Sequence, residues 1–427
     1  MVRAGRRPIA CAAGLILLAA GGCASWPSTW SERPCCVDTK PTVRRQPIAW
    51  HLLDVTLIEP VEQLADVGRW GRRLTGVPVR SLNLGDAQAA SAIGETAFFT
   101  DRPIATLSDE AVRWGPTNSH DAPRPPYTIT ALKTEGKTPG MFVTDRAGRR
   151  YLFKFDPVGA PELLSGAEVV TSKLLYALGY HVPSYEAVWT TLEELQLGPE
   201  VSAGDGHTAR HGLERMLAQH VRDGRLRVSA SRFLEGDILG PARFERFRDC
   251  TEVRALKLAY AWVNDTDAKD HNTLLVWDGA RTRGYLIDFG TSLGADAGLA
   301  GPKAPCAGTT YEVDPGVWVR RLVTLGWYRP GCGANGPVVS PSIGRFAPAL
   351  NPSHWKPYVP NLAFQQMNED DARWMARRLA QLTRRQLEAA VAAGQYARSE
   401  DVAYLVEALD RRRGAIVERY LKGDEGL

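Results

Sequence analysis

The sequence has little excess charge, few cysteines and no internal repeat. Its 52 Lys and Arg against 48 Asp and Glu leave a net charge of +4, which argues against a broad nucleic-acid-binding surface. Seven cysteines in 427 residues are too few for a disulfide scaffold. With 44% hydrophobic and 23% charged residues, the chain has the profile of a globular protein of two or three domains.

The sequence also lacks a hydrophobic run long enough to cross a bilayer. Its longest candidate, Ile9 to Ala20, is shorter than the ~20 residues required and follows a basic start, as in an export signal. Small residues before Cys23 resemble a bacterial lipobox, although Ala20 stands where Leu is usual. We therefore expect a signal peptide over 1–22, lipidation of Cys23 and a lipid-anchored protein of the cell envelope. Ordinary cleavage, giving a free periplasmic protein, is the alternative.

The composition then changes along the exported chain. Residues 23–47 are rich in Pro, Ser and Arg and predict a tether that contains the vicinal pair Cys35 and Cys36. Residues 48–125 form a region of unknown role, with a strand expected over Ala49–Val61. In an oxidising compartment a bridge between Cys306 and Cys332 is an option, but sequence alone does not fix the connectivity.

Residues 126–225 carry clear strand and helix patterns. A strand, a hairpin with a Gly-containing turn, a helix and another strand follow one another, which is the order of an antiparallel α+β lobe and not of a βαβ repeat. Residues 192–225 are polar and predict a loop or insertion. The expected elements are strands 127–132, 141–144, 150–155 and 185–190, and a helix over 161–178.

The remaining chain is expected to be mainly helical. Residues 226–360 should hold a helix over 241–263, a short hairpin of strands 273–277 and 284–287, and an irregular stretch over 295–360. Residues 361–427 should add a C-terminal extension of two or three amphipathic helices. The predicted fold is therefore α+β, with an antiparallel sheet lobe followed by a mainly helical lobe.

Five side chains in this frame have the chemistry that phosphoryl transfer needs. Lys154 lies on the hairpin, and Glu168 lies on the helix after it. The segment 264–272 supplies Asp267 and Asn272, five positions apart, and the second hairpin brings Asp288 back toward them. Such a set offers a cation for phosphate, a carboxylate to hold that cation, a base, and hard oxygen ligands for Mg²⁺.

These motifs resemble the protein-kinase-like superfamily, near its atypical HipA-like and phosphoinositide-kinase-like members. Asp267 and Asn272 match the Asp-x-x-x-x-Asn catalytic loop, and Asp288-Phe-Gly matches the metal motif. The resemblance covers about residues 127–295 and implies a two-lobed kinase-like fold that uses ATP and Mg²⁺.

The resemblance also implies a role for each matching residue. Lys154 would hold the nucleotide phosphates and Glu168 would anchor Lys154, while Asp267 would be the base with Lys269 beside the transferred phosphate. Asn272 and Asp288 would bind Mg²⁺. The segment before the hairpin is similar to a phosphate-covering loop, so it adds three candidate nucleotide-binding residues: Gly136, Lys137 and Thr138. The phosphoacceptor, a hydroxyl of a protein, lipid or sugar, is not identified.

The chain departs from the family pattern in three places. It has no G-x-G-x-x-G loop, and Asp265-Thr266 replaces the His-Arg that usually precedes the catalytic Asp. Glu162 competes with Glu168 as the partner of Lys154, and Glu168 is favoured because it lies mid-helix beside the apolar stripe. The missing glycine loop, and the scarcity of ATP in an envelope, keep open a pseudokinase that binds nucleotide or a partner without turnover.

Two further motifs point to other chemistry. Ser292 lies in a G-x-S-x-G pattern typical of serine hydrolases, but the following residues predict no helix and the later His354 lies in a Pro-containing segment. His207, His211 and His220 have a spacing that could hold a metal, but they lie in a polar segment for which an exposed loop is the better expectation.

Overall fold

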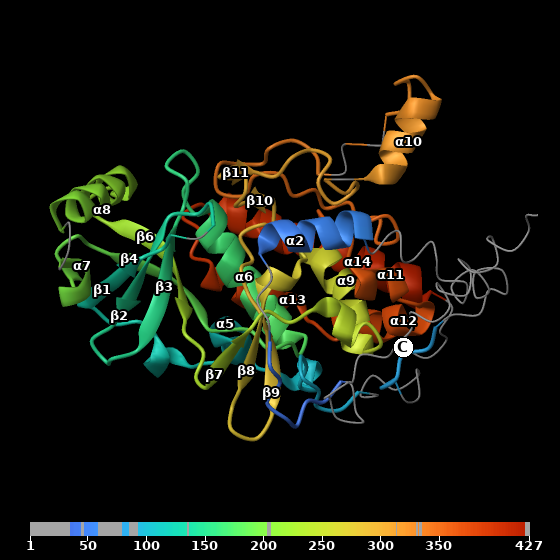
Figure 1. Cartoon of the computed structure of the whole chain (residues 1–427), viewed down its shortest axis with the longest axis horizontal. Coiled ribbons are helices and arrows are strands. Elements are labelled where there is room, and N and C mark those ends of the chain that lie inside the picture. Colours follow the sequence, from blue (N-terminus) through green and yellow to red (C-terminus); the bar gives the residue numbers. More distant parts are fainter. Residues whose placement is uncertain are drawn as a thin grey trace, which may run out of the picture.

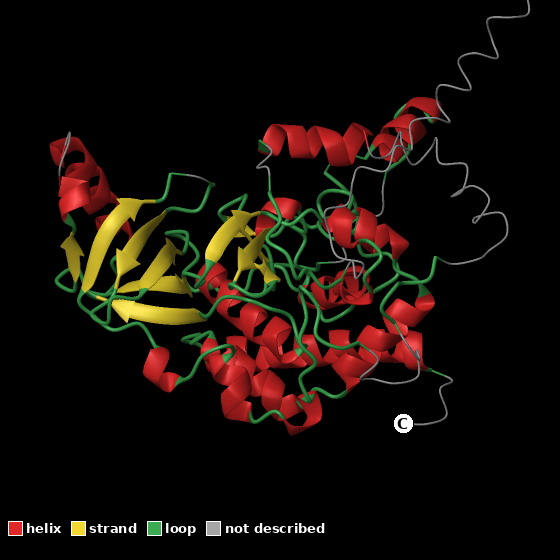
Figure 2. Cartoon of the chain, turned by 60° about the horizontal axis from the view of Figure 1, so that its bottom comes forward, coloured by secondary structure: helices red, strands yellow, loops and turns green. Residues whose placement is uncertain are grey.

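The computed structural model describes residues 35–43, 47–58, 79–84, 93–134, 136–202, 206–312, 314–329, 332 and 335–422. The chain has two lobes, a sheet lobe and a mainly helical lobe (Figure 1). Figure 2 shows the strands gathered toward one end of the molecule, with most helices beside and beyond them. The predicted two-lobed α+β class is confirmed.

The sheet lobe is built on six strands in the order β4-β6-β3-β2-β1-β5, antiparallel except for the β1–β5 pair. The register sets Lys154 opposite Gly140 on one side and Ser229 on the other. Because β6 belongs to this sheet, the lobe boundary expected at residue 225 falls one strand too early. The strands are β1 (Tyr127–Leu132), β2 (Gly140–Thr144), β3 (Arg150–Phe155), β4 (Tyr185–Thr190), β5 (Leu195–Leu197) and β6 (Leu226–Arg232).

Helix α6 (Leu163–Ala177) packs on β3, β4 and β6 and positions the site, much as the apolar spacing over 161–178 predicts. All of its residues except Tyr176 are buried, and its apolar residues enter the main core, so the helix is covered on every side. The helix is followed by Gly179, whose φ of 111° and close approach to the Phe99 ring, 2.3 Å from a hypothetical Cβ, require glycine.

The helical lobe is organised around a buried helix, α9 (Thr251–Val263). The Arg412 guanidinium donates to the carbonyls of Ala261 and Trp262, so it satisfies the end of α9. The helix expected over 241–263 starts ten residues later, after β7 (Asp237–Gly240) and the 3₁₀ turn η4 (Phe244–Phe247). Helices α11 (Leu362–Gln366), α12 (Glu369–Ala380) and α14 (Ser399–Leu421) pack on α9, and α13 (Arg384–Ala393) packs on α14, α5 (Asp109–Trp114) and α6.

A second sheet has three strands, one before α9 and two after it, and it contains the hairpin of β8 (Thr273–Trp277) and β9 (Thr282–Leu286). It has the order β7-β8-β9, where β8 and β9 are the predicted antiparallel pair. The short 3₁₀ turn η5 (Asp270–Asn272) leads directly into β8, and the strand pair β10 (Ala295–Asp296) and β11 (Gly301–Pro302) follows the hairpin.

The N-terminal segments pack against the helical lobe instead of acting as a free tether. Cys35 is buried and forms a disulfide with Cys250, the residue before α9, and Val37 pairs with Thr282 of β9. The tether expectation for 23–47 is therefore wrong over residues 35–43, while Cys23 lies outside the described residues. The strand expected over Ala49–Val61 is also wrong: the described part is a short helix, α2 (Ile48–Leu53), and a π-helical turn, η1 (Asp54–Ile58).

The remaining elements lie around this frame. The polar segment 192–225, expected as a loop, contains α7 (Pro199–Ser202) and α8 (Gly206–His220), whose Leu213 and Leu217 cover the outer face of the sheet. The irregular stretch 295–360 includes α10 (Pro315–Val323) and the disulfide Cys306–Cys332. The others are α5 (Asp109–Trp114), η2 (Ile104–Thr106) and η3 (Ser119–Asp121). Among the described helices, none combines the length and apolarity that crossing a bilayer demands.

Candidate functional site

A lysine on β3 joins two carboxylates from distant parts of the chain. Lys154 Nζ lies 2.5 Å from Glu168 Oε1 on α6 and 2.8 Å from Asp288 Oδ1 after β9. The second oxygen of Glu168 accepts a hydrogen bond from the Ser229 hydroxyl on β6. The structure therefore brings together three of the residues that the sequence analysis singled out. Glu162, the competing carboxylate, instead accepts from the backbone N–H of Ala397.

Burial makes this cluster electrostatically demanding. Lys154 and Glu168 are 6% and 2% exposed. Burial disfavours the charge on Lys154, but the carboxylates of Asp288 and Glu168 outweigh it and raise the pKa of Lys154 well above its usual value. Burial also opposes ionisation of Asp288, whose pKa is nevertheless lowered by the Lys154 ammonium. Lys154 is therefore a permanent cation that faces the partly exposed Asp288 carboxylate.

The predicted catalytic loop begins where α9 ends. Asn264 adopts the left-handed conformation with φ of 54° and turns the chain out of the helix. Three residues later the Asp267 carboxylate pairs with Lys269, at 2.6 Å between Oδ2 and Nζ. The Asn272 side-chain amide nitrogen donates to the Asp267 carbonyl at 2.8 Å, so its Oδ1 is the atom that could act as a metal ligand.

The β8–β9 hairpin returns the chain to this loop. Ile287 N–H donates to the Asn272 carbonyl at 3.0 Å, so Asp288 follows immediately beside Asn272. Asp288 has φ of 63°, which is uncommon for a residue other than glycine, and its N–H donates to the Tyr185 hydroxyl at 3.1 Å. An unusual backbone conformation held by a specific hydrogen bond is typical of a functional position. Tyr185 was not found from the sequence because only the folded β4 shows where its hydroxyl lies.

Two buried charged residues, Asp265 and Lys303, hold the loop after α9 in place through hydrogen bonds. The Asp265 carboxylate accepts from the Thr291 hydroxyl and the Asp267 N–H, and Lys303 Nζ donates to the Thr266 hydroxyl and the Thr291 carbonyl. Burial raises the pKa of Asp265 to about 6 and lowers that of Lys303 to about 8. Lys303 could not be predicted from the sequence, because no motif in its Gly-Pro-Lys-Ala-Pro surroundings marks it.

The β1–β2 connection lies at the edge of the same site. Lys133 Nζ donates to the Thr138 carbonyl at 2.8 Å, and Lys137 Nζ donates to the Gly298 carbonyl at 3.1 Å, so the loop contacts the segment after Asp288. At the end of the loop, a Cβ on Gly140 would lie 2.5 Å from the Phe153 carbonyl oxygen, so no other residue fits there. Gly136 and Thr138 lie in this loop next to Lys133.

The serine-hydrolase pattern at Ser292 and the histidines His211 and His220 on α8 do not have the surroundings that hydrolysis or metal binding needs. Ser292 is fully buried, and its hydroxyl bonds Thr171 and the Phe289 carbonyl, so it is not presented to a substrate. His211 and His220 lie on α8 and not in a loop. His211 is exposed beside Glu214, whereas His220 packs against the Phe155 ring. These two histidines therefore have separate surroundings and separate contacts.

The geometry gathers a buried cation, a partly exposed carboxylate, an amide oxygen and a second carboxylate with its own lysine around one edge of the sheet lobe. This set can bind an anionic ligand at Lys154 and a hard divalent cation at Asn272 and Asp288. It can also accept a proton at Asp267.

Comparisons with known proteins return protein kinases among solved structures. A Helicobacter pylori proinflammatory kinase, CtkA, is 13% identical with a TM-score of 0.36, and the alignment covers 69% of this chain and 98% of that one. A golgi casein kinase is 11% identical with a TM-score of 0.25, covering 88% of this chain and 94% of that one. No family model and no curated protein matches the chain. The structural neighbours are kinases, and these likenesses are distant.

Proposed function

We propose that the chain is a Mg²⁺-dependent phosphotransferase that moves the γ-phosphate of a nucleotide to a hydroxyl group. The observation that carries the proposal is the double contact of Lys154 with Glu168 and Asp288, which lie 14 and 134 residues away along the chain. A lysine held by a helix carboxylate and facing a second carboxylate beside an Asn is the arrangement that phosphate and metal binding require.

Each residue then has a defined task. Lys154 binds the phosphate oxygens of the nucleotide, and Glu168 fixes the position of its ammonium group. The Asp288 carboxylate and Asn272 Oδ1 are hard oxygen ligands and would hold Mg²⁺, which neutralises phosphate charge. Asp267 accepts the proton of the acceptor hydroxyl. The O–P bond to the acceptor forms as the bond between the γ-phosphorus and its bridging oxygen breaks, and the nucleoside diphosphate leaves.

Lys269 and Lys137 have supporting tasks in this proposal. Lys269 lies against the Asp267 carboxylate, where its charge compensates the transferred phosphate. The Gly136–Thr138 loop, with Lys137, would cover the nucleotide phosphates from the sheet side in place of a glycine-rich loop. Lys269 and Lys137 would thus add positive charge for phosphate binding to that of Lys154.

The compartment is also part of the proposal. We propose export to the cell envelope and lipidation at Cys23, in a protein of HipA-like type. The Cys35–Cys250 and Cys306–Cys332 disulfides suit an oxidising compartment, because such bridges do not persist in a reducing cytosol. The nucleotide would then have to be available outside the cytosol.

The decisive experiment combines a thermal-shift screen with an assay of phosphate transfer. ATP with Mg²⁺ should raise the melting temperature of the wild-type chain, because a ligand that binds only the folded state stabilises it. Asp288→Asn should remove the Mg²⁺-dependent part of this shift. Asp267→Ala should keep the shift but lower the turnover of ATP by about a hundredfold to ten-thousandfold.

Asp370→Ala is the matched control, since it removes a carboxylate on α12 that is 45% exposed and lies outside the site. It should change neither the shift nor the turnover. Equal turnover in the wild type and in Asp267→Ala would contradict the proposed base.

A catalytically silent nucleotide-binding module is the second candidate. The observation that favours it is the Lys269–Asp267 pair, which occupies the carboxylate that must accept a proton. This candidate predicts the same thermal shift without any phosphate transfer by the wild-type chain. The absence of a shift with every nucleotide tested would remove both candidates.

A further inference from the structure

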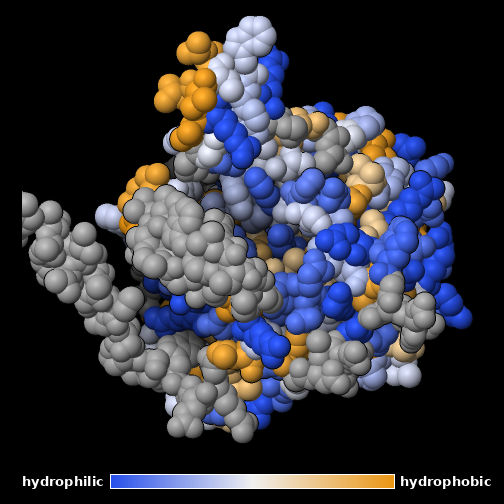
Figure 3. Space-filling model, turned by 90° about the vertical axis from the view of Figure 1, so that its right-hand side faces the viewer, coloured by the Kyte–Doolittle hydropathy of each residue, from blue (hydrophilic) through white to orange (hydrophobic). Residues whose placement is uncertain are grey.

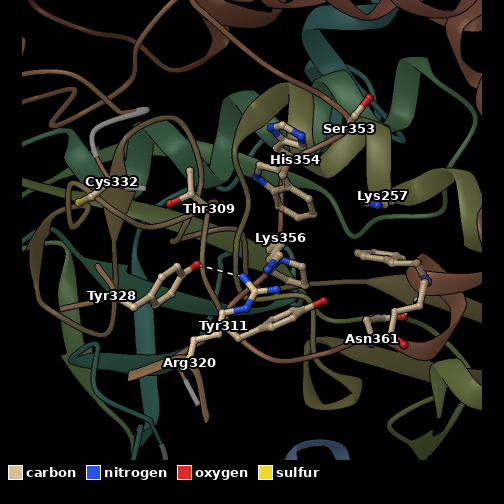
Figure 4. A pocket seen from close by; sticks show the side chains of 14 residues that line it. Lys257, Thr309, Tyr311, Arg320, Tyr328, Cys332, Ser353, His354, Lys356 and Asn361 are labelled. Atoms are coloured by element: carbon tan, nitrogen blue, oxygen red, sulfur yellow. Dashed lines mark hydrogen bonds between the residues drawn. The ribbon is translucent and has the colours of Figure 1, made fainter. Parts of the chain in front are cut away.

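A pocket of about 640 Å³ lies beside α9, α11 and the segment that carries the Cys306–Cys332 disulfide. It is distinct from the Lys154 cluster, since it shares no residue with it. Figure 4 shows side chains from several segments pointing into this space. Its volume falls within the range of pockets that hold small molecules. Its lining includes Lys257, Tyr311, Arg320, Tyr328, Ser353 and Lys356.

The pocket is cationic and its lining contains no carboxylate. Lys257, Arg320 and Lys356 all line it. Outside the lining, the Asp314 carboxylate lies 3.7 Å from Lys356 Nζ. Lys257 forms neither an ion pair nor a hydrogen bond with any described residue. A half-buried ammonium group without a counter-charge is unfavourable, so an anionic ligand would stabilise this pocket.

The two lysines also repel one another. Burial, and then the charge of Lys356, lower the pKa of Lys257. An anion between them would relieve both effects, because it would replace lost water and provide opposite charge. The remaining cation, Arg320, donates to the Tyr328 hydroxyl at 3.0 Å, and this bond directs its guanidinium toward the pocket (Figure 4).

Hydroxyls and rings complete the pocket. Ser353 and Thr309 add hydroxyl groups, and the Tyr311 ring lies 5.0 Å from Lys356 Nζ. A tetrahedral anion with several oxygens can use such a set of donors, and its organic substituent can lie against the rings. A compact inorganic anion would leave much of the volume unfilled.

Helix α10 lies at the pocket and is amphipathic. It supplies Arg320 to the lining, while another face of the helix and the turn after it are apolar and exposed. Figure 3 shows this hydrophobic surface on the segment that projects at the top of the molecule. Trp and Leu beside Arg are typical of helices that lie in a membrane interface. The exposed apolar residues are Trp318, Val319, Leu322, Val323, Leu325 and Trp327.

We propose that this pocket binds a phosphate-bearing organic group, in addition to the nucleotide of the main site. The phosphate accepts from Lys257, Lys356 and Arg320, and its substituent lies against the tyrosine rings. A soluble phosphoester and the headgroup of an anionic phospholipid share this chemistry. Because the apolar face of α10 could lie in a membrane interface, the phospholipid is tested separately. The proposal does not rest on phosphate transfer, and binding can be measured without ATP.

The experiment measures binding of sn-glycerol phosphate by calorimetry, and sedimentation with vesicles of phosphatidylglycerol or of phosphatidylcholine. The protein used in both measurements is residues 24–427, without the proposed signal peptide and lipidated Cys23. The test variant is Lys257→Met with Lys356→Met. The control is Lys40→Met with Lys422→Met, which removes the same charge from lysines that are 51% and 77% exposed elsewhere.

The test variant should bind the phosphoester at least about tenfold more weakly than the control, since each lost charged hydrogen bond changes affinity by roughly that factor. Its melting temperature should change little, because Lys257 loses no ion pair or hydrogen bond and Lys356 loses only a 3.7 Å pair with Asp314 in which its own side chain is 40% exposed. The proposal is supported when the wild type binds a probe and the test variant loses that binding. Binding of glycerol phosphate identifies a soluble phosphoester as the ligand, and binding of phosphatidylglycerol vesicles in preference to phosphatidylcholine identifies a lipid headgroup. Equal binding by the two variants, or no binding of either probe by the wild type, overturns it and leaves the nucleotide site untouched.

Discussion

Replacing Lys154 by Met tests whether the central cluster is the buried ion pair that the structure shows. The change removes the ammonium group and keeps most of the side-chain volume. Glu168 is 2% exposed and would lose its counter-charge, which costs about 3–5 kcal/mol for a buried pair. Asp288 also loses a partner, but its side chain is 46% exposed and can be rehydrated, so it adds little. A loss of this size is a large part of the ~5–15 kcal/mol that stabilises a typical folded protein.

The pH dependence separates this cause from a packing defect. Burial raises the pKa of Glu168 above its usual value, and the loss of Lys154 would raise it further. A carboxyl group whose folded pKa is raised is favourable below its unfolded pKa and loses that stability as the pH rises through the folded pKa. The destabilisation should therefore be small near pH 4 and grow toward about pH 7 and above.

Urea unfolding over this range measures the effect, with two comparison variants. Lys154→Met with Glu168→Gln removes the orphaned charge, and it should recover all but about 1–2 kcal/mol, since the Gln oxygen can still accept from Ser229. Lys40→Met breaks an exposed pair, with side chains 51% and 63% exposed, and should cost under about 1 kcal/mol. A Lys154→Met chain within about 1 kcal/mol of the wild type at pH 7, or a loss that does not change with pH, would refute the reasoning.

Two further predictions concern stability. Asp265→Asn should gain stability over the wild type as the pH rises. The folded pKa of Asp265 is about 6 against its usual 3.8, so the wild type loses about 3 kcal/mol over that interval. Urea unfolding at about pH 4 and about pH 7 checks the sign, and a constant difference would contradict it. The second concerns the disulfides: replacing Cys35 and Cys250 by Ser should cost more than replacing Cys306 and Cys332. Their cysteines are 215 and 26 residues apart, which corresponds to about 5 and about 3.5 kcal/mol of loop entropy. An equal loss in unfolding free energy would show that loop length does not govern the difference.

Local patterns predicted the parts of the fold whose periodicity is strong. Strands 127–132 and 185–190 agree with β1 and β4, and the helix expected over 161–178 is α6 with slightly shorter bounds. The same periodicity placed Glu168 on the inner side of α6, where its carboxylate reaches Lys154. These successes share one cause, since apolar spacing within a segment fixes which face is buried.

The failures came where tertiary contacts override composition. The Pro-rich segment around Cys35 is typical of a linker, yet its disulfide with Cys250 fixes it to the helical lobe. The polar segment 192–225 forms α8, because Leu213, Met216 and Leu217 on one side of that helix pack against the sheet. Neither a disulfide partner far along the chain nor a helix packed by so few side chains can be found from spacing alone.

The main departure from the family pattern has a structural explanation. Where the family places His-Arg before the catalytic Asp, this chain has Asp265 and Thr266, which weakens the sequence match. In the fold, Asp265 accepts from Thr291, three residues after Asp288, and the Thr266 hydroxyl accepts from Lys303. Both residues therefore tie the predicted catalytic loop to the segment that follows Asp288. These contacts fix the position of the loop that carries Asp267, so the absence of His-Arg does not by itself count against Asp267 as the proposed base.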